Sequence, residues 1–262
     1  MPSKSINQSK ELSLALNIAQ TAGEIALQHF AHGVSATMKS DNTPVTVADQ
    51  ECERMIREML GAEFPHDAIL GEEEGESSDA ALAKRKWIID PIDGTYNYAR
   101  QIPVWSMLIA LEDAGEIVLG VVHAPAMEET FWAERSAGAF RNGERTHVSK
   151  ISQMDQAQFV FGAPSRVAAM GLWDGLKRVV ETTYRQRAFG DYLTFAHVFN
   201  GKAEAGLEVG VKPWDLAPMK IIVEEAGGRY TDLKGGGSIY DGSCLVSNGL
   251  LHDEMLRLLL GD

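Results

Sequence analysis

The feature that most constrains this chain of 262 residues is a short apolar run that ends in two carboxylates. Residues 87–89, Trp-Ile-Ile, are followed by residues 90–95, whose sequence is Asp-Pro-Ile-Asp-Gly-Thr. Proline lacks an amide hydrogen and fixes φ, and glycine permits a tight backbone path, so we expect the chain to turn where the apolar run ends. The sequence therefore predicts a buried strand whose end presents Asp90, Asp93 and the carbonyl of Ile92 to one point outside the sheet edge.

These three groups offer only oxygen as a ligand. Oxygen ligands favour Mg²⁺, whereas zinc is usually bound through nitrogen and sulfur. The same loop is also compatible with a cluster of Asx turns at a strand end, because aspartate side chains readily bond to nearby backbone amides. From the loop alone, both interpretations stand.

The overall charge limits the classes of partner. The chain has 24 basic and 37 acidic residues, so its formal charge is 24 − 37 = −13. Sequence-independent nucleic-acid binding depends on basic side chains that neutralise phosphates, and we therefore expect no nucleic-acid partner. A phosphorylated metabolite is still a suitable ligand if metal ions reverse the local field.

Cysteine content and apolar run length indicate the compartment. The two cysteines, Cys52 and Cys244, lack the spacing of a disulfide framework or a thiolate zinc site, and they fit a reducing environment. We find no apolar run of about 18 residues and no signal-peptide pattern at the N-terminus. We therefore expect a cytoplasmic protein that does not associate with a membrane.

The spacing of apolar residues changes along the chain. Up to about residue 150, two helices precede short strands and hairpins, which is typical of an α+β arrangement with an antiparallel sheet; beyond it, strands and helices alternate as in an α/β layer. We expect helices at residues 11–31, 46–64, 167–182, 191–200, 214–226 and 251–260, and strands at 68–70, 87–90, 107–112, 116–123, 130–134, 159–163, 204–209, 228–231 and 244–246. The sequence thus predicts two lobes, residues 1–150 and 151–262, that share one cleft.

Three further acidic residues adjoin predicted elements. Glu72 comes directly after a strand, Asp215 lies in the first turn of a helix, and Asp49 follows Thr46 by three positions. Each also has an ordinary structural interpretation: a solvated acidic run for Glu72, a carboxylate favoured by the helix dipole for Asp215, and a capping box for Asp49. Motifs for nucleophilic serine, kinase-type or dinucleotide chemistry do not occur.

Taken together, five segments resemble the inositol monophosphatase family of Mg²⁺-dependent phosphomonoesterases. These segments are residues 43–49, 69–73, 87–95, 214–215 and 224–228. The pattern Trp-x-Ile-Asp-Pro-x-Asp-Gly-Thr is very specific, and Trp-Asp followed shortly by Glu-Ala-Gly-Gly makes a chance match implausible. The resemblance implies a layered αβαβα sandwich, commonly a homodimer, that acts on a small phosphorylated metabolite with Mg²⁺ as cofactor.

The resemblance also implies roles for individual residues. The implied metal ligands are Glu72, Asp90, the carbonyl of Ile92, Asp93 and Asp215. Thr95, hydrogen-bonded toward Asp49, would orient the attacking water and help to deprotonate it, with Glu72 in the same catalytic group. The backbone amides of Gly94 and Thr95 would hold phosphate oxygens, and Asp93 and Asp215 would also lie beside the substrate. A pair of metal ions in such a site activates the water and stabilises the leaving oxygen.

Within the family, the second half of the chain is similar to the histidinol-phosphatase branch. The similar segments are residues 102–111, 187–192 and 213–218. In that branch the residues that match Arg187 and Asp191 lie near the substrate, and an acid such as Asp191 or Glu208 could pair with the amino group of histidinol phosphate. A cyclitol has only hydroxyls and offers no such ion pair. Residues 96–98, Tyr-Asn-Tyr, depart from the family pattern, so the resemblance does not predict this part of the cleft wall.

Two other functions stay open at this point. One is inositol-1-monophosphatase activity, which would use the same metal ligands. The other, from a different class, is a non-catalytic partner protein that keeps only the fold. Against the latter, a structural relic has no reason to keep five groups that repel one another.

Overall fold

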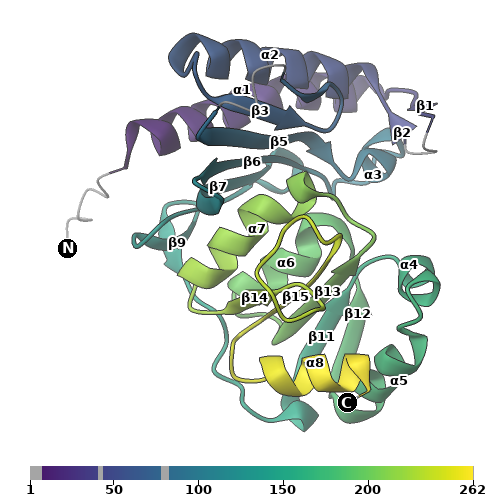
Figure 1. Ribbon diagram of the computed structural model, residues 1–262. Coiled ribbons are helices and arrows are strands. Elements are labelled where there is room, and N and C mark those ends of the chain that lie inside the picture. Colours follow the sequence, from purple (N-terminus) through teal and green to yellow (C-terminus); the bar gives the residue numbers. More distant parts are fainter. Residues whose placement is uncertain (1–7, 41–43, 78–82, 262) are drawn as a thin grey trace.

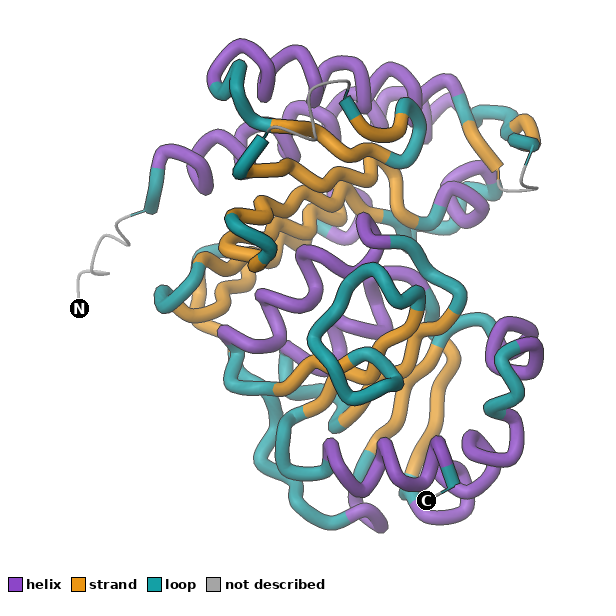
Figure 2. Tube along the Cα trace, viewed as in Figure 1, coloured by secondary structure: helices purple, strands orange, loops and turns teal. Residues whose placement is uncertain are grey.

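The computed structural model describes residues 8–40, 44–77 and 83–261, which are arranged in five layers (Figure 1). Two helices cover one face of a large sheet, two more lie between that sheet and a second one, and a final pair covers the far face of the second sheet. The strands accordingly form two groups with helices between them (Figure 2). This arrangement confirms the αβαβα sandwich expected from the sequence.

Within the described residues, the first sheet has eight strands in the order β10-β9-β8-β7-β6-β5-β3-β4. They are β3 (Ala68–Gly71), β4 (Gly75–Glu76), β5 (Arg85–Asp93), β6 (Ser106–Asp113), β7 (Glu116–Ala124), β8 (Glu129–Glu134), β9 (Gly138–Arg141) and β10 (Glu144–Thr146). Strands β3 and β5 run parallel, so their C-terminal ends lie at the same edge of the sheet. The turn after β3 is therefore beside the end of β5, where the acidic segment lies.

The central strands of this sheet are buried on both faces. In β6, Met107 and Ile109 contact the core beneath the outer helices, whereas Leu108 and Ala110 contact the core on the inner side. Successive side chains of a strand point to opposite faces, so a strand covered on both sides is apolar throughout. This burial explains why the sequence around β5 and β6 shows continuous apolar runs.

The outer helices are α1 (Lys10–His32) and α2 (Val47–Glu63). Each begins after a residue, Ser9 or Thr46, whose side-chain oxygen accepts an amide hydrogen of the first turn. The connection between these helices carries a short antiparallel pair, β1 (Thr37–Met38) and β2 (Pro44–Val45).

The second sheet has five strands within the described residues, in the order β12-β11-β13-β15-β14. They are β11 (Gln158–Phe161), β12 (Arg185–Ala188), β13 (Ala205–Val209), β14 (Arg229–Thr231) and β15 (Ser243–Ser247). The inner helices are α6 (Asp191–Phe199) and α7 (Pro213–Glu225), the outer ones are α5 (Trp173–Thr182) and α8 (His252–Leu260), and the short ones are α3 (Thr95–Ala99) and α4 (Pro164–Ala169). Single 3₁₀ turns occur at Pro125–Met127 and Met154–Gln156.

Helix α7 packs directly onto the first sheet although it comes from the second half of the chain. Gly120 of β7 makes this possible, because a β-carbon there would lie 2.8 Å from the backbone of Pro218 in α7. The close approach brings the N-terminal end of α7 to the end of β5 (Figure 1).

Several elements differ from the expectation. The strand predicted at 87–90 continues to Asp93, with a shift of register between Asp90 and Asp93, so the acidic segment is an irregular strand end. The helix predicted at 167–182 is two helices, α4 and α5, separated by Gly171 in a left-handed conformation (φ 72°). Strand β12 was not predicted, because its residues, Arg-Gln-Arg-Ala, are polar and lie at the sheet edge. The short helix α3 was also not predicted.

The two lobes predicted on either side of residue 150 stay a prediction. The strands pass from the first sheet to the second between Thr146 and Gln158, but α7 packs against strands of both sheets. Residues 1–7, where we expect no signal peptide, lie outside the described residues, as do residues 41–43. In the part of the chain that is described, no helix is long and apolar enough to cross a membrane.

Candidate active site

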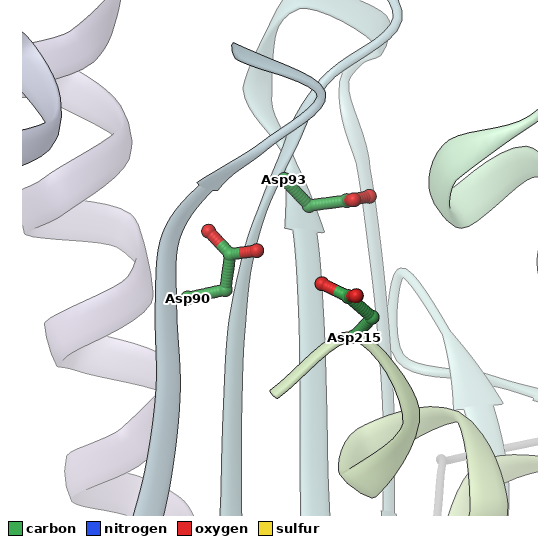
Figure 3. Close-up of side chains that lie close together, drawn as sticks. All are labelled: Asp90, Asp93 and Asp215. Carbon is green, nitrogen blue, oxygen red and sulfur yellow. The ribbon is translucent and has the colours of Figure 1, made fainter. Parts of the chain in front are cut away.

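Three carboxylates meet at the C-terminal end of β5 (Figure 3). One oxygen atom from each of Asp90, Asp93 and Asp215 lies within 4.8 Å of the others. Asp90 and Asp93 come from β5, and Asp215 comes from the first turn of α7. The side chains point into a common space between the two elements, which is the convergence expected of a cation site.

Local backbone contacts hold Asp90 and Asp93 in place. One Asp90 oxygen accepts the amide of Ile92 at 2.9 Å, and Oδ2 of Asp93 accepts the amide of Tyr192 in α6 at 2.8 Å. The next residue, Gly94, is left-handed (φ 87°), and a β-carbon there would lie 3.0 Å from the carbonyl oxygen of Val104. The Asx-turn interpretation of this segment is therefore correct for Asp90, and it coexists with the convergence of carboxylates.

Asp215 is oriented by the cap of its own helix. Its Oδ2 accepts the amide of Lys212 at 2.7 Å, as a carboxylate in the third helical position does in a capping box. The helix dipole also favours a negative charge there. The structural interpretation of Asp215 is thus correct as well, and the cap is what aims this side chain at β5.

The electrostatics of the three carboxylates favour a bound cation. Burial, followed by repulsion from Glu72 and Asp93, raises the pKa of Asp90 well above its ordinary value. Burial raises the pKa of Asp93 in the same way, with Asp191 and Asp215 adding to it, and burial raises the pKa of Asp215 to about 7. Like charges this close disfavour ionisation of one another, and a hard cation between them removes that penalty. The set of oxygen ligands therefore fits a divalent ion such as Mg²⁺.

Thr95 and Asp49 form a second part of the site. The hydroxyl of Thr95 lies 3.1 Å from Oδ1 of Asp49 and 3.1 Å from the carbonyl oxygen of Ile92. The other oxygen of Asp49 accepts the amide of Thr46 at 2.8 Å, which completes the capping box of α2. Asp49 therefore makes two kinds of contact at once: one oxygen belongs to the capping box of α2, and the other accepts the hydroxyl hydrogen of Thr95. Burial raises the pKa of Asp49 to about 6, although the hydrogen bonds from Thr46 and Thr95 oppose the shift.

Glu72 lies in the turn between β3 and β4, at the edge of the same pocket. Its Oε1 is 2.8 Å from Nζ of Lys39, which also lies 2.7 Å from Oε1 of Glu73. Burial alone would lower the pKa of Lys39, but the two glutamates outweigh that effect and raise it. Lys39 was not identified from the sequence, because it lies in an irregular segment where no local pattern marks a functional residue.

The pocket extends from the carboxylates toward the second half of the chain. Its volume is about 330 Å³, and its lining includes Ile92, Gly94, Thr95, Asp191 and Glu208. Asp191 adjoins the acidic cluster, because a β-carbon at Gly94 would lie 3.5 Å from its carboxylate. Gly94 and Thr95 thus lie where their amides were expected to hold phosphate, a role that stays a prediction.

Asp191 has an unusual backbone conformation and is held by a side-chain contact. It is a left-handed residue other than glycine (φ 50°) at the start of α6, and its Oδ2 accepts a hydrogen bond from the Asn97 side chain at 2.7 Å. Strained conformations of this kind persist where the surroundings enforce them, and they cluster at functional sites. Burial raises the pKa of Asp191 to about 6, and Arg166 and Asn97 oppose the shift.

Glu208 is nearly inaccessible, at 5% exposure, on β13. Its Oε1 accepts the hydroxyl hydrogen of Thr194 at 2.6 Å, and a β-carbon at Gly162 would collide with the carboxylate. Burial raises the pKa of Glu208 to about 8. Arg166 of α4 lines the same end of the pocket and lowers the pKa of both Glu208 and Asp191. Arg166 and Asn97 were not identified from the sequence, since nothing local distinguishes them from surface residues.

Arg187 does not line the pocket. It is exposed on β12, at the end of the second sheet, where its Nη1 donates to the carbonyl oxygen of Gln186 at 2.7 Å. The expected contact of Arg187 with the substrate therefore stays a prediction, because within one chain this side chain lies outside the pocket.

Known proteins resemble this chain over nearly its whole length. Histidinol-phosphatase of Mycobacterium tuberculosis is 42% identical over 255 residues, which are 95% of this chain and 97% of that protein. The fructose-1,6-bisphosphatase/inositol-1-monophosphatase of Thermotoga maritima is 35% identical over 95% of both chains. Among solved structures, the extragenic suppressor protein suhB of Bartonella henselae superimposes with a TM-score of 0.89 at 29% identity, covering 96% of this chain and 98% of that one.

An αβαβα sandwich with this carboxylate-lined pocket defines a phosphoric monoester hydrolase. The model of the inositol monophosphatase family matches residues 7–260, and the chain belongs to that family.

Proposed function

We propose that the enzyme hydrolyses histidinol phosphate with Mg²⁺ as its cofactor. The observation that carries this proposal is a second pair of carboxylates in the pocket, the half-buried Asp191 and the buried Glu208, next to the acidic cluster. A substrate that has a cationic amino group beyond its phosphate would pair with them, and its charge would favour their ionised forms. The similarity to histidinol-phosphatases of Mycobacterium tuberculosis and Streptomyces coelicolor, at 42% and 38% identity, supports the same substrate.

Asp90, Asp93 and Asp215 would hold the metal, with the Ile92 carbonyl and Glu72 at the edge of the set. Bound Mg²⁺ would supply Lewis-acid stabilisation of the phosphoryl and leaving oxygens and would acidify a nearby water. The choice of Mg²⁺ rests on the all-oxygen ligand set and its charge. Phosphate-monoester hydrolysis is among the slowest uncatalysed reactions, which accounts for so many acids in one place.

Thr95 and Asp49 would position the attacking water. The Thr95 hydroxyl can donate to Asp49, which leaves its oxygen lone pairs available to accept a hydrogen bond from the water. Asp49 in turn is fixed by Thr46, so this pair needs little reorganisation during the reaction. The amides of Gly94 and Thr95 would bind phosphate oxygens beside it.

Inositol 1-phosphate is the second candidate substrate. It is favoured by the 35% identity to the Thermotoga maritima enzyme named for that activity, and it would use the same metal ligands. The two candidate substrates differ in the groups that they would present to Asp191 and Glu208. A desolvated carboxylate without a partner is costly, so a site built around a charge pair discriminates strongly against a substrate that carries only hydroxyls.

Substrate competition tests the proposal. We expect kcat/KM for histidinol phosphate to exceed that for inositol 1-phosphate by at least about tenfold, which corresponds to roughly 1.4 kcal/mol. Activity on both should disappear in EDTA and return with Mg²⁺. Equal values, or a preference for inositol 1-phosphate, would assign the enzyme to the inositol branch. Absence of phosphate release from any substrate would favour a non-catalytic partner protein that retains the fold.

We also propose a cytoplasmic homodimer. Cys52 and Cys244 are buried free thiols, which suits a reducing compartment. Strand β12 ends the second sheet, and Tyr184 and Phe189 beside it are 77% and 39% exposed. A second copy packed there would cover these aromatic side chains and bring Arg187 to the subunit boundary. Light scattering on the wild type and on Tyr184→Glu measures this: the wild type should have twice the mass of one chain, and the variant should dissociate.

A further inference from the structure

Helix α2 carries a second buried acid, Glu53, one turn after Asp49. Its side chain is fully buried, and its two carboxylate oxygens accept the amides of Glu73 at 2.8 Å and Glu74 at 3.0 Å. These are the two residues that follow Glu72 in the turn between β3 and β4. The carboxylate of Glu53 therefore holds the backbone directly beside Glu72.

Arg57, one further turn along α2, completes this contact. Its Nε and Nη2 lie 2.9 Å and 2.8 Å from Oε1 of Glu53, and Nη2 donates to the carbonyl oxygen of Gly75 at 2.5 Å. The guanidinium thus compensates the buried charge of Glu53 and also binds the far end of the turn. A buried carboxylate needs such partners to stay ionised at an acceptable cost.

Gly71 shows that the approach of Glu53 to the turn is close. A β-carbon at Gly71 would lie 2.2 Å from Oε1 of Glu53, so a larger residue there would push the carboxylate away. The turn is held by Glu53 at its centre, by Arg57 at its end and by the bare backbone of Gly71 at its start.

Helix α2 therefore contacts both parts of the site. Asp49 and Glu53 are four positions apart, so they share one face of the helix. Asp49 receives the Thr95 hydroxyl, and Glu53 holds the turn that carries Glu72. We propose that Glu53, supported by Arg57, is a positioning residue that fixes Glu72 for metal binding at a set distance from the Asp49–Thr95 pair. This inference rests on the proposed role of Glu72 as a metal ligand.

Glu53→Gln tests the inference. Glutamine keeps the size but presents an NH₂ group to one of the two loop amides, so that donor faces donor and the turn loses a contact. Hydrogen-bond partners of metal ligands typically contribute 10–100-fold in metal affinity, and we expect the Kd for Mg²⁺ measured by calorimetry to rise by at least about tenfold. The matched control is Glu58→Gln, which removes the same charge from an exposed position of α2 and should leave the Kd within twofold of wild type.

Melting in EDTA separates positioning from a merely structural role. If Glu53 only stabilises the fold, Glu53→Gln lowers the Tm of the metal-free protein and leaves the Kd for Mg²⁺ unchanged, and that result overturns the inference. If Glu53→Gln does not fold, Arg57→Lys decides, because lysine keeps the charge but replaces the planar guanidinium, which turns two nitrogens toward Glu53, by a single nitrogen. A rise of about threefold or more in Kd supports the inference, whereas an unchanged Kd overturns it.

The wild type distinguishes this inference from the proposed function. A wild type that binds no Mg²⁺ by calorimetry overturns the proposed cofactor and, with it, the inference. A wild type that binds Mg²⁺ beside variants of Glu53 and Arg57 that bind it equally well overturns the inference alone.

Discussion

The pocket has two adjoining parts, a metal end and a substrate end, and their acids are held in different ways. At the metal end, Asp90 and Asp93 belong to one irregular strand, and backbone amides of Ile92 and Tyr192 hold their carboxylates. At the substrate end, Asp191 and Glu208 come from separate elements and are held by side chains, those of Asn97 and Thr194. A position defined by the backbone survives many substitutions around it, whereas one defined by a side-chain contact changes with a single residue.

This difference suggests a division of labour. The metal end would supply chemistry that any phosphomonoester needs, and the substrate end would decide which phosphomonoester is hydrolysed. Substitutions at the metal end should then abolish turnover of every substrate, while substitutions at the other end should only reorder the substrates.

The largest effect is expected for Asp93→Asn. Loss of one ligand charge should lower kcat/KM for every phosphomonoester by about 10³-fold or more, since the contribution of a bound metal amounts to several kcal/mol. Burial and the charges of Asp191 and Asp215 raise the pKa of Asp93, so removing its charge relieves repulsion. The Tm of the metal-free variant should equal or exceed that of wild type, with the exposed Asp155→Asn as control. A Tm lower by many degrees would show that Asp93 is mainly a structural turn residue.

Thr95→Ala should have the next largest effect. We expect kcat to fall by about 10²-fold, at the lower end of what general acid–base groups contribute, because the water loses its alignment. The Kd for Mg²⁺ should stay within about threefold of the wild-type value, since the Thr95 hydroxyl is not one of the expected metal ligands. Steady-state kinetics measures kcat, and calorimetry measures the Kd. If rate and metal affinity fall together, Thr95 is primarily a ligand and Asp49 keeps only its capping role.

Variants at the substrate end should alter preference and spare the chemistry. Glu208→Gln or Asp191→Asn should reduce the ratio of kcat/KM for histidinol phosphate over inositol 1-phosphate by about tenfold, since each removes one partner of the amino group. Hydrolysis of a small phosphomonoester whose alcohol part carries no charge should change by less than about threefold. Equal losses on all three substrates would instead place these acids in the catalytic machinery and contradict the division of roles between the metal end and the substrate end.

The smallest effect concerns pH and stability. Burial raises the pKa of Glu208 from 4.5 to about 8, so between these values the folded protein binds a proton that the unfolded chain releases. This contribution to stability is complete below pH 4.5 and is lost as the pH rises toward 8. In EDTA, the Tm of wild type should therefore fall between pH 5 and pH 8 by a few degrees more than that of Glu208→Gln, about the size expected for 1–2 kcal/mol in a chain of this length. Parallel curves would show that Glu208 is ionised in the folded protein across this range.

Much of the site followed from local sequence. The segment 87–95 contains its strand, its turn residues and two carboxylates within nine positions, so chain geometry alone brings Asp90, Asp93 and Thr95 near one another. The capping role of Asp49 and the first-turn position of Asp215 were also readable, because each involves residues only a few positions apart. The αβαβα fold followed from the resemblance to the family, whereas the apolar runs by themselves predicted only the buried strands.

The remaining parts depended on contacts between distant segments. Arg187 was expected beside the substrate, yet β12 is an edge strand that places it in solvent, and no local pattern reveals which strand ends a sheet. Lys39 and Arg166 line the pocket, and Asn97 contacts Asp191, only because three separate segments are packed together there. Sequence by itself determined the chemistry at the end of β5, since those groups lie only a few residues apart along the chain. Tertiary packing decided which side chains from the rest of the chain surround that chemistry, because their proximity arises from burial and from interlayer contacts such as that of Gly120 with α7.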